Sequence, residues 1–166
     1  MSADTPAVER VHPPDWLMKI INPLTRFLLK CGKPDAMAER VGLLRFRGRR
    51  TGRRFELPAG VRRVRGRLAT LTNSSWRFNF RDGHELELFH RGEWHEARGT
   101  LLEDPDEVAA IYEDLIAHVG YEDAPRQLGI RINVDRTPTR QELRAMAERS
   151  GLSVLWYDLG DDTEGA

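Results

Sequence analysis

The chain contains little cysteine and little lysine, and it has no long hydrophobic run. Cys31 is the single cysteine among 166 residues, so an intrachain disulfide is excluded. A reducing, cytoplasmic setting is consistent with this composition. No apolar stretch approaches the ~18 residues of a membrane span, and the polar start of the chain predicts no signal peptide. Together with 40% apolar and 31% charged residues, these absences indicate a globular, cytoplasmic protein.

Motifs of the common enzyme classes are also missing. The sequence has no nucleophile elbow, no Walker loop and no dinucleotide-binding glycine fingerprint. Its five histidines have no metal-ligand spacing. Cys31 follows a Leu-Leu-Lys run that is interpreted as a helix end, where a packed cysteine is more common than a nucleophile. The sequence therefore predicts no metal site and identifies no catalytic residue.

The net charge is zero, yet the charges are unevenly distributed along the chain. Between Val41 and Arg67, ten arginines accompany one acidic residue, Glu56, whereas between Asp82 and Glu122 twelve acidic residues accompany two arginines. A cationic segment of this density is typical of contact with phosphate or carboxylate groups. The competing interpretation is a solvated arginine-rich surface, because a chain with three lysines and 23 arginines has the bias of a GC-rich genome.

Hydrophobic periodicity predicts an α+β fold with about six strands. The alternating segments are 41–47, 55–64, 68–72, 86–90, 94–102 and 152–156. Short, evenly spaced strands favour a meander or a small barrel, and the last strand is expected at an edge of the sheet. A loop at 73–75 precedes a single helical turn at 76–80. Helical spacing predicts a long helix over 105–119, capped by Asp104, and a second helix from Thr139 to Gly151.

Residues 15–160 are predicted to form one domain between flexible tails at 1–14 and 161–166. Apolar residues at helical spacing follow Asp15, and Pro23 interrupts them. This pattern predicts an amphipathic segment over 15–31, in one kinked helix or two short ones. We favour docking of this segment on the domain over peripheral contact with a membrane, because it carries few basic residues.

The most informative pattern is a glycine-bounded turn between two predicted strands, which reads Gly48-Arg49-Arg50-Thr51-Gly52-Arg53. Glycine permits positive φ angles in such a turn. The turn amides, the Thr51 hydroxyl and the arginine guanidinium groups can together bind an anionic group. Downstream, Pro58, the segment Thr72-Asn73-Ser74 and the pair Trp76 and Asn79 follow in order.

This ordered set resembles the F420-dependent nitroreductase and quinone-reductase family, the deazaflavin-dependent relatives of FMN-binding split β-barrels. Family members carry a Gly-Arg-Lys/Arg-Thr/Ser-Gly turn, a proline on the following strand and a Trp-x-x-Asn-Leu segment. The chain matches these at Gly48–Gly52, Pro58 and Trp76–Phe80. The resemblance implies a split β-barrel. With the helical patterns of the sequence, it predicts a barrel with an N-terminal amphipathic helix, a long helix near 105–119 and a C-terminal helix plus strand. It also implies a homodimer.

The resemblance further implies coenzyme F420 as the cofactor, with FMN as the alternative, and hydride delivery to a quinone, a nitro compound or an enone. The matching cofactor-binding residues are Arg49, Arg50, Thr51, Arg53, Pro58, Thr72, Asn73, Ser74, Trp76 and Asn79. The arginines and Thr51 would hold the anionic tail of the cofactor, with Thr72–Ser74 beside its phosphate. Trp76 and Asn79 would brace the pocket. Because the cofactor carries the hydride chemistry, no catalytic side chain is required.

Two departures from the family leave the cofactor and the substrate open. The loop before Trp76 is short, and the tyrosine-rich segment that shapes the family's substrate pocket is reduced to Tyr121. Tyr112 and Tyr121 are therefore the candidates for the substrate side. The alternatives are a barrel that has lost its cofactor and a non-catalytic module that binds anions or nucleic acid. Nucleic acid is disfavoured because only Phe46 and Phe55, both expected to point inward, interleave with the arginines.

Overall fold

The structure is a computed structural model and describes residues 5–11 and 40–160. The chain forms two compact units. The described residues of the helical unit are 5–11 and 102–154, and those of the sheet unit are 40–101 and 155–160. The prediction of one domain over 15–160 did not anticipate this division. In chain order the elements are β1 (Val8–Arg10), β2 (Val41–Arg47), β3 (Arg54–Gly60), β4 (Arg62–Val64), β5 (Arg67–Thr72), η1 (Ser75–Phe80), β6 (His84–His90), β7 (Glu93–Leu102), α3 (Pro105–Val119), α4 (Ala124–Leu128), β8 (Ile130–Ile132), α5 (Arg140–Ser150) and β9 (Ser153–Leu159).

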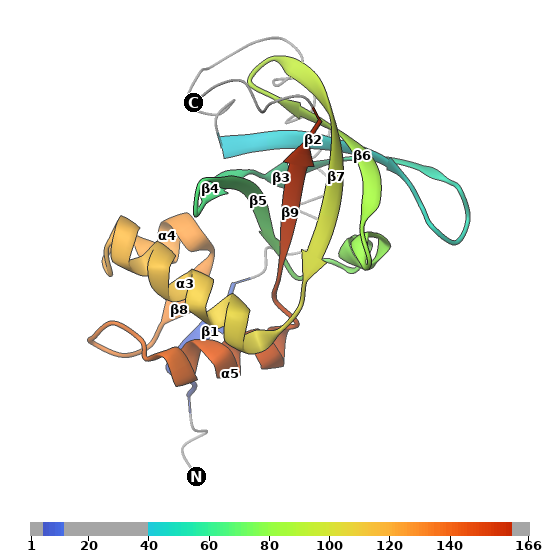
Figure 1. The fold of residues 1–166 in the computed structure, drawn as a ribbon. Helices are drawn as coiled ribbons and strands as arrows, with labels where there is room; N and C mark the ends of the chain where they lie inside the picture. The colour runs from blue at the N-terminus through green and yellow to red at the C-terminus, as the bar shows by residue number, and fades with distance from the viewer. Residues whose placement is uncertain (1–4, 12–39, 161–166) are drawn as a thin grey trace. The chain divides into compact units, whose positions relative to one another are not determined.

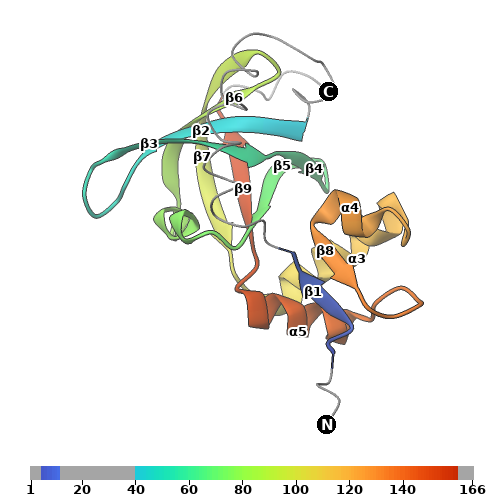
Figure 2. The same ribbon diagram turned by 180° about the vertical axis from the view of Figure 1, so that it is seen from behind.

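The large sheet has seven strands in the order β3-β2-β6-β7-β9-β5-β4. β3 and β4 stand at opposite ends of this order, yet Val61 alone separates them along the chain. The sheet must therefore curl until its two ends approach each other, and Figures 1 and 2 show this curl. The predicted α+β fold with a barrel-like sheet is confirmed. The predicted strand 55–64 is divided into β3 and β4 by the corner at Val61.

A buried hydrogen-bond chain holds the corner where the two ends of the sheet approach. The Thr70 hydroxyl donates to the Gly60 carbonyl at 2.7 Å, and the Tyr157 hydroxyl oxygen lies 2.6 Å from Thr70 Oγ1. Because the Thr70 proton is directed to Gly60, the Tyr157 phenol is the donor in the second bond. Burial raises the pKa of Tyr157, so the phenol keeps the proton that this bond requires.

The interior of the curled sheet is apolar. Alternate residues of the strands point into it, and its buried members are Leu44, Phe46, Val61, Phe80, Leu86, Leu88, Ala97, Leu155 and Tyr157. Gly99 is buried at the wall of this core, where an added Cβ would lie 2.6 Å from the Phe80 ring. Glycine at this position leaves the space that Phe80 occupies.

The position of the last strand corrects one prediction. β9 does not form an edge but lies between β7 and β5. The side chains of β9 that reach the core of the sheet are Leu155 and Tyr157. Both neighbours of β9 come from segments much earlier in the chain, so local alternation does not locate this strand within the sheet.

The helical unit contains the two predicted helices at their predicted caps. The Asp104 carboxylate accepts the backbone N–H groups of Asp106 and Glu107 at the start of α3, and Thr139 and Glu142 form a reciprocal capping box at the start of α5. An ion pair between Arg140 and Glu113, at 2.9 Å, connects the two helices.

The N-terminal residues correct a second prediction. Residues 8–10, which the sequence placed in a tail, form β1, and Val8 is buried opposite Ile132 of β8. Strands of three residues are too short to produce a recognisable alternation, so neither β1 nor β8 was predicted. The amphipathic segment predicted over 15–31 and the tail at 161–166 lie outside the described residues. In the part of the chain that the structure describes, no helix is both long enough and apolar enough to span a bilayer.

The capping box of α5 leads to a prediction about the stability of the folded protein at low pH. Hydrogen bonds from Arg136 and from the Thr139 backbone lower the pKa of Glu142 from 4.5 to about 2. The folded state therefore favours the carboxylate, whose stabilising effect is complete above pH 4.5 and is lost as the pH falls towards 2. We expect Glu142→Gln to reduce the free energy of unfolding at pH 7 by about 1 kcal/mol, since solvent screens the pair.

Chemical denaturation between pH 2 and pH 7 measures this effect. The wild-type free energy of unfolding should fall more steeply between pH 4.5 and pH 2 than that of Glu142→Gln. Glu148→Gln is the matched control, because Glu148 makes an exposed pair with Arg144 on the same helix and such pairs contribute less than about 0.5 kcal/mol. Equal acid profiles for Glu142→Gln and the wild type would contradict the assignment.

Candidate functional site

The β2–β3 turn closes through its own backbone. The Gly48 N–H donates to the Arg53 carbonyl and the Gly52 N–H donates to the Gly48 carbonyl, both at 2.8 Å. The Arg53 N–H donates to Thr51 Oγ1 at 3.2 Å, and Gly52 has a φ of +67°. The amides of Gly48, Gly52 and Arg53 are therefore used within the turn. The arginine side chains and the proton of the Thr51 hydroxyl are donors that can bind an anion.

Arginines at this turn carry unneutralised positive charge. Arg50, Arg53 and Arg54 are exposed, and none of them forms an ion pair with a carboxylate among the residues that the structure describes. Arg45, on the same hairpin, is different because it pairs with Glu56 at 3.1 Å and with Glu87 at 3.4 Å. The net positive charge of the hairpin is thus concentrated at its tip, where it attracts anions.

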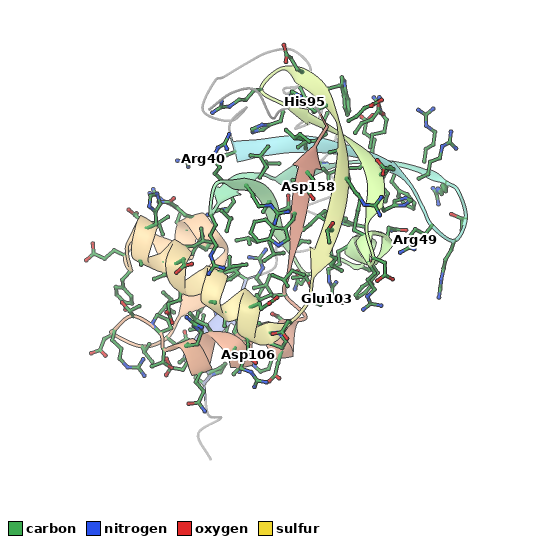
Figure 3. The ribbon with its side chains drawn as sticks, in the orientation of Figure 1. Arg40, Arg49, His95, Glu103, Asp106 and Asp158 are labelled. Carbon is green, nitrogen blue, oxygen red and sulfur yellow. The ribbon has the colours of Figure 1, made fainter. Side chains whose placement is uncertain are left out.

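The short helix η1 holds the turn through Asn79. The Asn79 side-chain oxygen accepts the Arg49 N–H at 3.0 Å, and its side-chain nitrogen donates to the Trp76 carbonyl at 2.8 Å. The Arg49 guanidinium donates to the Arg81 carbonyl, and Figure 3 shows Arg49 beside η1. The structure thus brings together three predicted site residues, Arg49, Trp76 and Asn79. Arg49 acts as a tether of the turn.

The segment at the end of β5 leads directly into η1. The Ser74 N–H donates to Thr72 Oγ1 at 3.1 Å, and the Thr72 side chain is buried. Arg77 is also buried, and it donates to the carbonyls of Asn73 and Ser74 at 2.7 and 2.9 Å. At about 2 Å per residue, Ser74 lies roughly 10 Å from Asn79 along η1. The sequence analysis missed Arg77, because this residue occupies a position that the Trp-x-x-Asn pattern leaves unspecified.

An aromatic cluster supports the turn from the inside of the sheet. The Phe46 ring stacks on Phe55, at 5.3 Å between centroids, and meets Phe80 edge-on at 5.0 Å. Trp76 packs edge-on against Phe80 at 6.1 Å, and the His84 ring packs against the other side of this cluster at 5.9 Å from Phe80. Trp76 therefore packs against aromatic residues of β2 and η1, and its bracing of a cofactor pocket stays a prediction.

Three predicted site residues lie elsewhere. Pro58 is on β3, opposite Leu43, and at about 3.3 Å per residue it is roughly 13 Å along the strand from Arg54. Tyr112 and Tyr121 both belong to the helical unit. The Tyr112 side chain is fully buried in α3, and the Tyr121 hydroxyl donates to the Val134 carbonyl at 2.6 Å. The structure does not bring Pro58 to the turn, and both tyrosines have structural surroundings.

The described residues were also compared with the side-chain arrangements that hold metal ions. Over residues 5–11 and 40–160, no group of three or more His, Cys, Asp or Glu side chains is arranged to hold a metal ion. The donors at the turn are cationic and neutral, and these suit an anion.

Comparison with known proteins gives a distant likeness. No family model matches the chain, and no curated protein matches it. One solved structure, from a mycobacterium and described as a domain-swapped dimer, is 16% identical, with 89% of this chain and 100% of that chain aligned at a TM-score of 0.43. The strand order and register of this chain themselves define its curled, barrel-like sheet.

Proposed function

We propose that the protein is an oxidoreductase that binds coenzyme F420 and delivers hydride to a small electrophile, such as a quinone, a nitro compound or an enone. The observation that supports this proposal is the hairpin tip, where Arg50, Arg53 and Arg54 have no carboxylate partner among the described residues. The tip is fastened to the segment that resembles the family's Trp-x-x-Asn motif.

The donors at the turn fit the anionic tail of a deazaflavin in part. Arg50 and Arg53 would bind its phosphate and carboxylate groups by charge-assisted hydrogen bonds, and the Thr51 hydroxyl would donate a further one. Arg49 and Asn79 would keep the turn in place. The buried Thr72 and the Ser74 amide, which already binds Thr72 Oγ1, fit a phosphate less well than the resemblance implies.

The bound cofactor would supply the hydride transfer, and the protein would supply binding and orientation. The chain's own contribution is therefore a preorganised cationic turn whose geometry is set before the ligand arrives. Preorganisation reduces the entropy lost on binding.

Titration of the purified protein with oxidised F420 and, separately, with FMN tests the proposal, with cofactor fluorescence as the readout. We expect binding of F420 at micromolar concentrations and weaker binding of the same deazaflavin chromophore without its anionic tail. Added salt should weaken the binding of F420 more than that of the tail-free chromophore, because salt screens the exposed charges. No binding of F420 at micromolar levels would overturn the proposal, and binding of FMN alone would favour the FMN alternative.

A non-catalytic anion-binding module is the second candidate, and the same unpaired arginines favour it. Stacking of single-stranded bases has little support, because exposed Phe78 already has the guanidinium carbons of Arg77 and Arg81 within 4.1 and 4.2 Å of its ring centre. This module would bind F420, its isolated tail groups and other polyanions alike. Failure to reduce any electrophile with reduced F420 would distinguish it from an oxidoreductase. The homodimer implied by the resemblance also stays a prediction.

A further inference from the structure

We propose that His84 is a positioning residue that holds the cationic turn in the shape that receives an anion. The nature of the anion rests on the proposed function, whereas the positioning role rests on the geometry of the hairpin alone. The sequence analysis assigned no role to this histidine.

The hairpin needs such a support because its tip extends beyond the rest of the sheet. β2 pairs with β6 only from Leu43↔Phe89 to Arg45↔Glu87, whereas its pairing with β3 continues to Arg47↔Arg54. Past Arg45 the hairpin is a two-stranded ribbon, and Figures 1 and 2 show it projecting from the sheet. An isolated two-stranded ribbon is only marginally stable in water.

His84 makes its contact where the backbone pairing has stopped. Its Nε2 lies 2.6 Å from the Arg47 carbonyl oxygen. A carbonyl only accepts, so Nε2 carries the proton and donates it. The ring is held by Phe80, and the residue opposite His84 on β7 is Gly99, whose missing side chain leaves room for Phe80. The backbone of β6 pairs with β2 up to Arg45. The hydrogen bond from the His84 side chain extends this support to Arg47.

Three contacts from one short segment therefore hold the ribbon tip. Asn79 accepts the Arg49 amide, the Arg81 carbonyl accepts the Arg49 guanidinium and His84 donates to Arg47. All three act on residues 47–49, immediately before the exposed Arg50. They leave the guanidinium groups of Arg50 and Arg53 outside the tether, so the tether can orient the turn without occupying its anion-binding side chains.

Hydrogen exchange of the ligand-free protein, followed by F420 titration, tests this role in His84→Ala and His84→Gln. The Arg49 amide is the reporter, because its partner is Asn79 and His84 does not contact it. We expect His84→Ala to speed exchange of this amide and to weaken F420 binding by about 3–10-fold, the usual effect of one lost hydrogen bond. His84→Gln keeps an N–H donor and should stay within about twofold of the wild type in both measurements.

His95→Ala is the matched control, because His95 is a half-buried histidine on β7 of the same sheet unit. Figure 3 shows it well away from Arg49. Unchanged exchange in His84→Ala, or equal losses in His84→Ala and His84→Gln, would overturn the positioning role. If wild-type protein fails to bind F420, the proposed function fails, and the exchange of the Arg49 amide still decides the role of His84.

Discussion

Replacement of both Arg50 and Arg53 by alanine should weaken F420 binding by about 2–4 kcal/mol, with little change in the free energy of unfolding. A hydrogen bond to a charged group contributes about 1.5–3 kcal/mol, and the two side chains overlap in their action on one tail. Both arginines are exposed and, within the described chain, neither pairs with a carboxylate, so their removal breaks no native ion pair. Fluorescence titration at fixed ionic strength gives the affinity, and chemical denaturation gives the stability.

Arg49 is left intact in this variant for a structural reason. Its amide and its guanidinium both fasten the turn to the segment around η1, so its replacement would mix positioning with anion binding. The matched control is Arg63→Ala with Arg65→Ala, which removes the same charge from two exposed positions of the same unit, one on β4 and one in the β4–β5 turn. An equal loss of affinity in the control would assign the effect to net charge and would contradict a local site at the hairpin.

Phe80→Ala should cost about 3–5 kcal/mol of the free energy of unfolding, the usual range for a buried phenylalanine. Phe80 is fully buried, and its ring contacts Phe46, Trp76 and His84. Its removal leaves a cavity between the core and η1. Because those three neighbours all stand beneath the hairpin tip, loss of F420 affinity should accompany the loss of stability. Thermal and chemical denaturation measure the first effect, and titration well below the melting temperature measures the second.

Phe78→Ala is the control for this experiment, since Phe78 lies on the same short helix but is 39% exposed. Its ring contacts the guanidinium groups of Arg77 and Arg81 rather than the core. We expect a loss below about 1 kcal/mol, as for most exposed positions. Equal losses for Phe80→Ala and Phe78→Ala would mean that the aromatic cluster does not support η1.

Local signals in the sequence predicted the parts of the fold that local chemistry determines. Asp104 and Thr139 mark their helix starts because their side chains bind the first free amides. Gly48 and Gly52 bound the β2–β3 turn because one leaves room for Phe55 and the other adopts a positive φ. The α+β class and the barrel-like sheet followed from these starts, turns and alternations.

Long-range pairing explains what the sequence did not predict. The central place of β9 depends on neighbours far away in the chain, and β1 becomes a strand only through its pairing with β8. The candidate site likewise has parts that the sequence predicted and parts that depend on long-range contacts. The turn and Asn79 were predicted, but the tethering role of Arg49, the buried Arg77 and the contact of His84 with Arg47 depend on segments that meet only after folding.

The insertion of β9 between β7 and β5 has a consequence for synthesis on the ribosome. Thr70 and Tyr157, which meet at the corner of the sheet, are 87 residues apart in the chain. The N-terminal strands of the sheet, the cationic hairpin among them, emerge long before the strand that completes it. Until β9 is released from the exit tunnel, β5 and β7 each present an unpaired edge. The nascent chain therefore passes through a stage in which these two edges are open to pairing with other chains.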